Sequence, residues 1–153
     1  MIQMKKAIYF DMDGTLAALF FVKGYDKMLA DGDTTPYTIA RPLYNVDEMK
    51  TEITRLKNLG YSIGVISYYG KDSDNEMIKR TRKAKKEWLK KYFPYADEIH
   101  IINPNTKKAK AAKIKNAILV DDSTKNRAEW NLGNTINGHF RKNFMGALKA
   151  ITE

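Results

Sequence analysis

The sequence contains no cysteine, and none of its apolar stretches is long enough to span a bilayer. The lack of cysteine excludes disulfides, thiolate metal sites and cysteine nucleophiles, and it is compatible with a cytoplasmic location. The opening residues, Met-Ile-Gln-Met-Lys-Lys, lead into a predicted strand rather than a secretory segment. We therefore expect a cytoplasmic protein with no membrane partner.

Histidine and negative charge are both scarce. Neither His100 nor His139 has a second histidine or a carboxylate at ligand spacing, so we expect both to be structural or surface residues. Lys and Arg total 27 against 18 Asp and Glu, a net charge of +9 that is concentrated in residues 71–91 and 107–115. Such runs are typical of solvated helix faces, but a field that attracts nucleic acid or nucleotides is the alternative.

A single domain accounts for residues 1–153. The hydrophobic content of 43% is sufficient for one core, and no repeat or linker composition divides the chain. Buried strands are predicted at residues 7–10, 61–67, 98–102 and 117–120, with an edge strand at 133–136. Helices are predicted at residues 45–60, 76–92, 106–115, 123–130 and 144–151. Strands that alternate with helices predict an α/β fold with a mainly parallel sheet.

The first predicted strand ends at two carboxylates. Asp11 and Asp13 follow Ala-Ile-Tyr-Phe and precede Gly14. Alternation places both carboxylates on one side of an extended chain, and glycine permits a turn where a side chain would clash. Carboxylates this close repel unless a cation lies between them, which favours an oxygen-seeking ion such as Mg²⁺ with phosphate as the third party. The alternative is an Asp-rich turn after a strand.

Two later strands end in residues that favour a site. Ser67 closes the second strand, and a right-handed parallel connection brings it near Asp11 at the carboxyl edge, where open α/β sheets bind ligands. The strand Ala-Ile-Leu-Val ends in Asp121 and Asp122. Two apolar strands that are about a hundred residues apart therefore both end in aspartate pairs, as a site at one sheet edge requires.

The basic helix predicted at residues 76–92 has one lysine on its apolar side. At ~100° per residue, Lys85 falls at the centre of the apolar stripe, while the solvent side holds Lys79, Lys83, Lys86 and Lys90. Lys85 needs an anionic partner, because burying an unpaired ammonium costs several kcal/mol. Snorkelling of its stem to solvent is the alternative.

Residues 17–44 are an irregular segment between regular elements. The segment is rich in aromatic residues, and among them Phe20 and Phe21 lie nearest to the aspartates. We expect a small lid that excludes water and lines a substrate pocket with these two side chains. A long loop packed on the core is the alternative.

The assembled motifs resemble those of the haloacid dehalogenase superfamily of phosphotransferases. Asp11-Met12-Asp13-Gly14-Thr15 matches its first motif, Ser67 the second, Lys85 the third and Asp121-Asp122 the fourth. Within the superfamily the chain looks most like the 5'(3')-deoxyribonucleotidase group of bacteria and phages. That likeness includes Ile-Tyr-Phe-Asp-Met-Asp-Gly-Thr-Leu-Ala and the run Lys-Lys-Glu-Trp-Leu before an aromatic-proline stop.

The resemblance implies a fold and an activity. The fold would be a Rossmann-like three-layer sandwich with a small cap, residues 17–44, inserted after the first strand. The activity would be Mg²⁺-dependent phosphomonoester hydrolysis through an aspartyl-phosphate, with a small phosphomonoester such as a (deoxy)nucleoside monophosphate as substrate. Two alternatives stay open: a phosphatase that acts on nucleic-acid ends, and a non-catalytic module that binds phosphate or nucleic acid.

The resemblance also implies a role for each motif residue. Asp11 would be the nucleophile and Asp13 the general acid and base. The phosphoryl group would be bound by Gly14, Ser67, Tyr68 and Lys85. The metal would be bound by Asp11, the Asp13 carbonyl, Asp121 and Asp122.

Three features depart from the nucleotidase pattern. Thr15 stands where many members have valine, and Leu19 stands where they tend to have a base-stacking phenylalanine. The loop after Tyr68 is longer and more polar than the group leads us to expect. These departures put the substrate, rather than the chemistry, in question.

Overall fold

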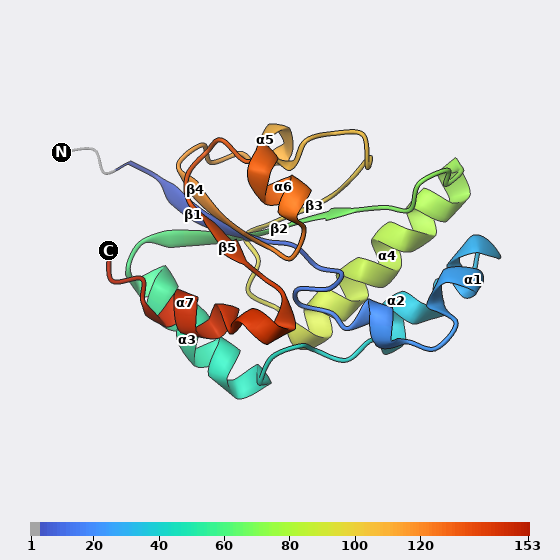
Figure 1. The fold of residues 1–153 in the computed structure, drawn as a ribbon, viewed down its shortest axis with the longest axis horizontal. Helices are drawn as coiled ribbons and strands as arrows, with labels where there is room; N and C mark the ends of the chain where they lie inside the picture. The colour runs from blue at the N-terminus through green and yellow to red at the C-terminus, as the bar shows by residue number, and fades with distance from the viewer. Residues whose placement is uncertain (1–3) are drawn as a thin grey trace.

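The structure, a computed structural model, describes residues 4–153, so the first three residues of the opening stretch lie outside it. Five strands form one parallel sheet in the order β3-β2-β1-β4-β5 (Figure 1). Their bounds are Lys6–Phe10 (β1), Tyr61–Tyr68 (β2), Glu98–Ile102 (β3), Ala117–Asp121 (β4) and Thr135–Asn137 (β5). All pairings are parallel, so the predicted α/β fold is confirmed.

The central position of β1 explains its continuous apolar sequence. It pairs with β2 on one side and β4 on the other, so that Phe10 lies opposite both Val65 and Val120. Alternate residues of β1 enter two different cores: Ile8 and Phe10 belong to one, and Ala7 and Tyr9 to the other. A strand that is covered on both faces must be apolar throughout.

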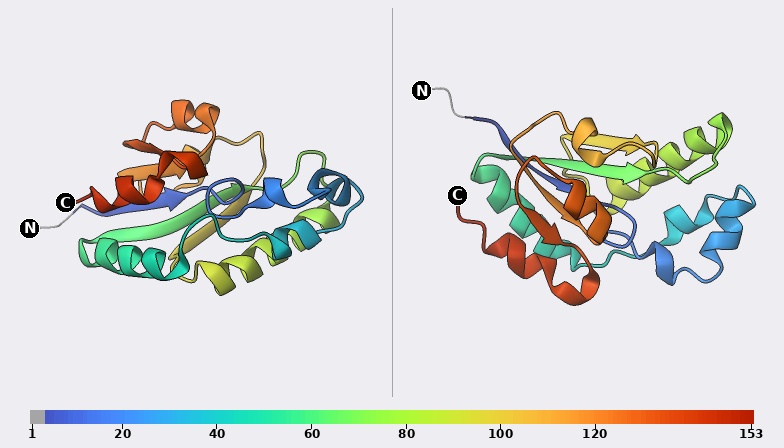
Figure 2. Two further views of the ribbon diagram at one scale, coloured as in Figure 1. Left: turned by 60° about the horizontal axis from the view of Figure 1, so that its bottom comes forward. Right: turned by 45° about the horizontal axis from the view of Figure 1, so that its top comes forward.

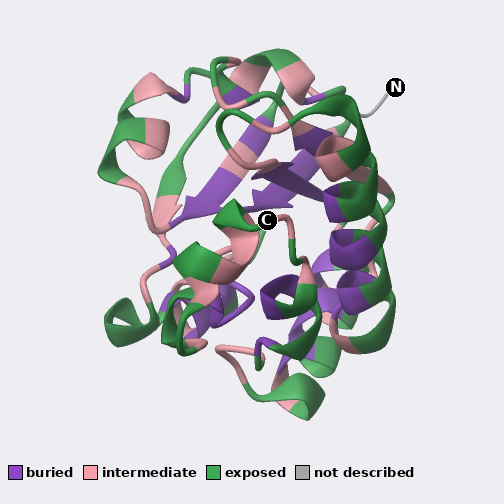
Figure 3. Cartoon of the chain, turned by 90° about the vertical axis from the view of Figure 1, so that its right-hand side faces the viewer, coloured by how far each residue is buried: buried purple, intermediate pink, exposed green. Residues whose placement is uncertain are grey.

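Helices cover both faces of the sheet, which gives three layers (Figure 2). The larger core contains residues from β1 and from α3 (Val46–Asn58), α4 (Asn75–Tyr92) and α7 (Phe144–Lys149). The smaller core lies on the opposite face, beneath α5 (Lys108–Ala111) and α6 (Thr124–Glu129). Figure 3 shows the sheet and the inward helix faces as the buried part of the chain. This is a Rossmann-like arrangement.

The two long helices begin at side-chain caps. Asn45 accepts a hydrogen bond from the Glu48 backbone N–H at 2.9 Å at the start of α3. Asp74 accepts one from Met77 N–H at 2.8 Å at the start of α4. Each cap satisfies an N–H that has no partner within its helix, which is worth about 1 kcal/mol. The Asp74 cap fixes the residue at which α4 begins, and thereby the side of the helix on which Lys85 lies.

Residues 17–44 are more regular than we expected. They contain a 3-10 turn (Leu19–Phe21) and two short helices, α1 (Tyr25–Ala30) and α2 (Thr35–Ile39). Pro36 in the first turn of α2 fixes a helical φ where no N–H partner is lost. Helix α2 packs along α4 (Figure 1), so tertiary contact supports a helix too short to be stable alone.

The helix predicted at residues 106–115 is also wrong in extent, because α5 ends at Ala111. Ala112 is extended, and from there the chain runs back to the start of β4. Within residues 4–153, no helix is long and apolar enough to cross a membrane.

Candidate active site

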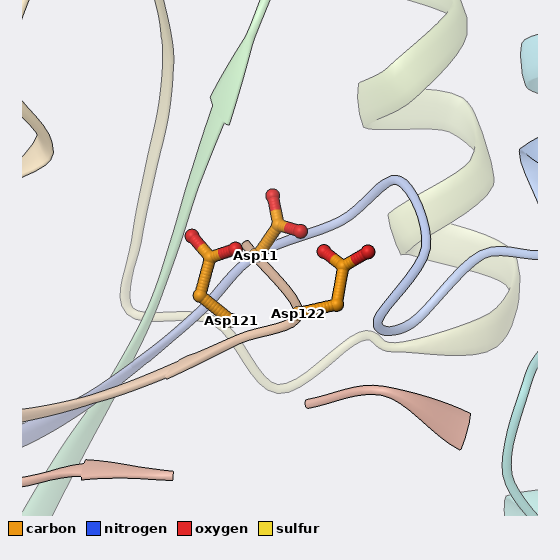
Figure 4. A group of neighbouring side chains, drawn as sticks. All are labelled: Asp11, Asp121 and Asp122. Carbon is orange, nitrogen blue, oxygen red and sulfur yellow. The ribbon is translucent and has the colours of Figure 1, made fainter. Parts of the chain in front are cut away.

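Three neighbouring strands bring the predicted residues to one edge of the sheet. Ser67 lies near the end of β2, Asp11 directly follows β1, and Asp121 ends β4. Figure 4 shows the carboxylates of Asp11, Asp121 and Asp122 turned toward one another. One oxygen from each lies within 4.8 Å of the others. The strand order thus joins residues that are far apart in sequence.

Of the two aspartates that follow β1, Asp11 is more deeply buried than Asp13. It is 7% exposed, its Oδ1 accepts a bond from Lys108 Nζ at 2.8 Å, and its Oδ2 accepts one from Thr15 Oγ1 at 3.1 Å. Burial raises the pKa of Asp11 to about 6, although the Lys108 charge opposes the rise. The two hydrogen bonds hold the carboxylate in place. Burial leaves it poorly solvated, which increases its reactivity toward an electrophile.

Lys108 is a site residue that the sequence interpretation missed. Its Nζ also donates to Asp121 Oδ2 at 2.8 Å, so that one buried ammonium bridges the carboxylates at the ends of β1 and β4. Burial alone would lower the pKa of Lys108, but the charges of Asp11 and Asp121 outweigh it and raise the pKa. Lys108 is therefore a permanent cation at this site.

Lys85 has the anionic partner that its position on α4 requires. Its Nζ donates to Asp13 Oδ2 at 2.7 Å, Ser67 Oγ at 2.8 Å and the Tyr68 carbonyl at 2.8 Å. Its side chain is fully buried, so snorkelling to solvent is wrong. Three acceptors satisfy the three N–H groups of the ammonium. Lys85 therefore links α4 to the ends of both β1 and β2.

Asp13 keeps one buried carboxylate oxygen free. Its Oδ1 has no hydrogen-bond partner among residues 4–153. Tyr37, on α2, lies beside the Asp13–Lys85 pair, with its ring centroid 4.8 Å from Lys85 Nζ. Burial, followed by the charge of Asp13, raises the pKa of Tyr37. A buried acceptor without a donor is expected where an external proton donor or ligand binds.

The carboxylate cluster fits a divalent cation. Burial raises the pKa of Asp121, and the negative charge of Asp11 beside it raises this pKa further, against the opposing charge of Lys108. Four carboxylates, those of Asp11, Asp13, Asp121 and Asp122, face only two ammonium groups that contact them. Two negative charges are left over, and all the donor atoms are oxygen, which suits Mg²⁺. Asp11, Asp121 and Asp122 are the side chains that would hold it.

Gly14 adopts the turn that the sequence predicts. Its φ is +85°, a left-handed conformation that glycine tolerates best. A Cβ at this position would lie 2.5 Å from Asp122 Oδ2 and 2.7 Å from the Phe20 ring. Any side chain here would therefore displace the fourth-motif aspartate. The proposed roles of Gly14, Ser67 and Tyr68 in phosphate binding stay predictions.

Thr15 joins the two aspartate motifs. Its hydroxyl donates to Asp11 Oδ2 and accepts from the Asp122 N–H, both at 3.1 Å. The residue is fully buried, and Gly138, after β5, leaves the space that it occupies. Threonine at this position therefore has a defined structural function.

We expect Gly138→Ala to destabilise the protein by about 1–3 kcal/mol, the usual range for overpacking a core. The new Cβ would lie 2.7 Å from Thr15 Cγ2 and 3.2 Å from the Asp121 carbonyl carbon, neither of which can move freely. Urea unfolding measures the change. Gly70→Ala is the control, since its Cβ would meet only the end of one short side chain, the Ser73 hydroxyl, at 3.2 Å. Equal stability of the two variants would contradict the packing argument.

An apolar pocket of about 180 Å³ opens beside Gly14 and Asp122. Phe20 and Phe21 line it together with His139 and Phe140, which the sequence interpretation did not place there. That Phe20 and Phe21 contact a substrate stays a prediction. His139 stacks on Phe140 at 4.5 Å, and Phe21 meets Phe140 edge-on at 5.3 Å. The other histidine is His100, whose Nε2 lies 2.8 Å from Glu98 Oε1. Glu98 does not belong to the carboxylate cluster, so this contact is consistent with a structural residue.

The fold and the site define a Rossmann-like α/β protein with a carboxylate and lysine site at the carboxyl edge of its sheet. No protein-family model and no curated protein matches the chain. Eight chains among the solved structures do match. One is D,D-heptose 1,7-bisphosphate phosphatase from Burkholderia thailandensis, 12% identical, with a TM-score of 0.49 over 96% of this chain and 100% of that chain. A similarity of this degree does not establish a reaction, so function is argued below from the site.

Proposed function

We propose that the protein is a Mg²⁺-dependent phosphomonoester hydrolase of the haloacid dehalogenase type. The observation that supports it most strongly is the convergence of Asp11 and the Asp121-Asp122 pair from adjacent strands, bridged by Lys108. A mere Asp-rich turn would not bury these carboxylates or bring a second aspartate pair to them. Mg²⁺, when bound, would offset charge on the phosphoryl oxygens and on these carboxylates.

Asp11 is placed to attack phosphorus. Bonds from Lys108 and Thr15 fix both of its oxygens, so the carboxylate has a defined orientation. Attack forms an aspartyl-phosphate and breaks the bond between phosphorus and the leaving oxygen. Water then attacks phosphorus, releases phosphate and restores the Asp11 carboxylate.

Asp13 is placed to move the proton. Lys85 holds its Oδ2 at 2.7 Å, and its Oδ1 has no hydrogen-bond partner among residues 4–153, so Oδ1 is the oxygen that is free to exchange a proton. In its protonated form Asp13 donates the proton to the leaving oxygen in the first step, and the carboxylate so formed accepts a proton from the attacking water in the second. The Ser67 hydroxyl, which accepts from Lys85, would donate to a phosphoryl oxygen from the β2 side, whereas Lys85 would have to exchange one of its three present acceptors to do so.

A nucleoside monophosphate is the substrate that the pocket favours. An apolar cavity of ~150 Å³ can bind a benzene-sized ring, and the pocket beside Asp122 measures about 180 Å³. Its aromatic walls suit a planar base. Residues 17–44 would act as the cap, since they contribute Phe20 and Phe21 to this pocket and Tyr37 to the Asp13–Lys85 pair.

The test is phosphate release by the purified protein from a panel of phosphomonoesters, with Mg²⁺ and with a chelator. The panel contains nucleoside monophosphates, sugar phosphates and glycerol phosphate. We expect Mg²⁺-dependent release, fastest from a nucleoside monophosphate. An absence of release from every member would disprove the hydrolase, whereas equal rates for all members would disprove only the nucleotide preference.

We expect Phe21→Ala to change substrate preference more than stability. Phe21 is 67% exposed, so its loss leaves no core cavity, but it removes one wall of the pocket. The ratio of kcat/KM for a nucleotide to that for glycerol phosphate should fall by roughly tenfold, the upper range for one aromatic contact. Ile39→Ala, an exposed change in the same segment, is the control. A fall in melting temperature with equal loss on both substrates would show that Phe21 belongs to the core.

A further inference from the structure

A basic groove runs along one side of α4, and none of the three clustered carboxylates lines it. Its volume is about 550 Å³, and its walls include Tyr69, Ile78 and four cations: Lys79, Arg82, Lys83 and Lys86. We call these six residues the basic groove. In Figure 1 this helix lies on the right of the molecule, below the end of β2. Tyr69 is the residue directly after β2.

The charge of the groove is unbalanced. No carboxylate lines it, and none of its four cations forms an ion pair among residues 4–153. Lys79 and Lys83, like Arg82 and Lys86, are four residues apart on the helix, and like charges at that spacing destabilise it. A polyanion in the groove would remove this repulsion.

One end of the groove combines a fixed cation with an aromatic ring. Arg82 donates from Nε at 3.2 Å and from Nη2 at 3.1 Å to the carbonyl of Ile101 on β3. The guanidinium carbon lies 5.7 Å from the centre of the Tyr69 ring. The backbone of Tyr69 is fixed by its N–H, which donates to the Ile102 carbonyl at 3.0 Å. The guanidinium is therefore held in place before any ligand binds, beside an aromatic residue whose backbone is anchored to β3.

Regularly spaced cations beside an aromatic ring suit a chain that alternates phosphates with flat bases. We propose that the basic groove binds single-stranded nucleic acid, with phosphates on Lys79, Lys83 and Lys86 and a base on the Tyr69–Arg82 pair. The strand would enter beside the site, because the Tyr68 carbonyl accepts from Lys85 and Tyr69 follows it. Binding requires no hydrolysis. Only delivery of a terminal phosphate to Asp11 rests on the proposed function.

Fluorescence anisotropy of a labelled 12-nucleotide single strand tests the proposal. The protein has the Asp11→Asn change throughout, so that the probe is not consumed and failure of the hydrolase does not affect the result. The groove variant is Lys79→Gln/Lys83→Gln/Lys86→Gln. The control is Lys50→Gln/Lys90→Gln/Lys110→Gln, which removes the same charge from exposed lysines that lie outside the groove.

We expect the groove variant to bind roughly a hundredfold more weakly at 50 mM salt and to lower the slope of log K against log salt by about two, because three phosphate contacts are lost. The control should stay within a few-fold of the parent. Tyr69→Ala should weaken single-strand binding by roughly tenfold and leave duplex binding unchanged. Circular dichroism checks that each variant keeps its helices.

Equal weakening by the groove and control variants would overturn the proposal, since net charge alone would then explain binding. No detectable binding by the Asp11→Asn protein would overturn it as well. Vesicles containing phosphatidylserine form a separate arm. Groove-dependent vesicle binding without oligonucleotide binding would assign the groove to a lipid surface instead.

Discussion

Replacing Asp11 by Asn is expected to abolish phosphate release and, at the same time, to stabilise the metal-free protein. The loss of activity follows from the mechanism, because an amide cannot form the aspartyl-phosphate. Removal of a catalytic nucleophile lowers kcat by at least about a thousandfold. The gain in stability follows from removal of a buried charge. It would distinguish a carboxylate whose burial costs stability from one that stabilises the fold.

The sign of the stability change follows from the pKa of Asp11, which rises from 3.8 to about 6 on folding. Between those pH values the folded protein keeps a proton that the unfolded chain has released. The free energy of unfolding therefore falls as the pH rises through this window, and it stays lower above it. A tenfold change in a proton-binding constant corresponds to about 1.4 kcal/mol. Asp11→Asn removes this cost and also removes one partner of Lys108, so we expect a net gain on the order of 1–3 kcal/mol at pH 7.5.

Thermal unfolding with a chelator, at pH 7.5 and at pH 4, measures this effect. The gain should be several degrees at pH 7.5, should nearly vanish at pH 4, and should shrink when Mg²⁺ is added to both proteins. The control is Asp72→Asn, the same chemical change on an exposed loop residue. A lower melting temperature for Asp11→Asn at pH 7.5 would show that the Lys108 contact outweighs burial. The site would then be structural rather than strained.

The sheet and its carboxylates could be predicted because both depend on local patterns. A parallel sheet that is covered on two faces needs apolar strands, and the runs that end at Asp11, Ser67 and Asp121 are of this kind. Parallel connections then bring the strand ends together whatever their distance in sequence. Lys85 could be found because it interrupts the apolar stripe of a long helix.

Lys108 could not be found in this way, because its environment is produced by tertiary structure. It lies in the run Lys-Lys-Ala-Lys, where no sequence feature distinguishes it from its exposed neighbour Lys107. The four-residue helix α5 has too few turns to show a face. A charge count contains the only signal: four aspartates at one sheet edge need more than the single lysine that the helix pattern supplies.

Residues 17–44 illustrate the same limit. Helix α2 forms on α4, and its Tyr37 is buried against Lys85 and Asp13 only because that packing exists. Thr35-Pro36 is a helix-start signal that the sequence does contain. The pocket residues His139 and Phe140 come from a turn about 120 residues after Phe20, and no periodic pattern connects them.

Lys108→Met is expected to have the largest effect on stability. Met retains most of the volume of the side chain but leaves Asp11 and Asp121 without their shared cation, within 4.8 Å of each other and of Asp122. Removing one partner from a buried ion pair costs about 3–5 kcal/mol. The metal-free variant should therefore unfold at a markedly lower temperature. Its kcat should fall roughly a hundredfold or more, because a charge fixed beside the nucleophile is lost.

Mg²⁺ should restore part of the stability of Lys108→Met, and this is the decisive measurement. A second cation at the same carboxylates is the only compensation the variant has, so its melting temperature should rise more with Mg²⁺ than that of the wild type. Lys107→Met, next to it and exposed, is the matched control and should behave as wild type in both conditions.

Combining Lys108→Met with Asp11→Asn should recover stability without metal, since one carboxylate is then removed together with the ammonium. If Lys108→Met were as stable as wild type in chelator and unresponsive to Mg²⁺, the carboxylates would not form a cation site at all. The hydrolase proposed from them would then lose its main support.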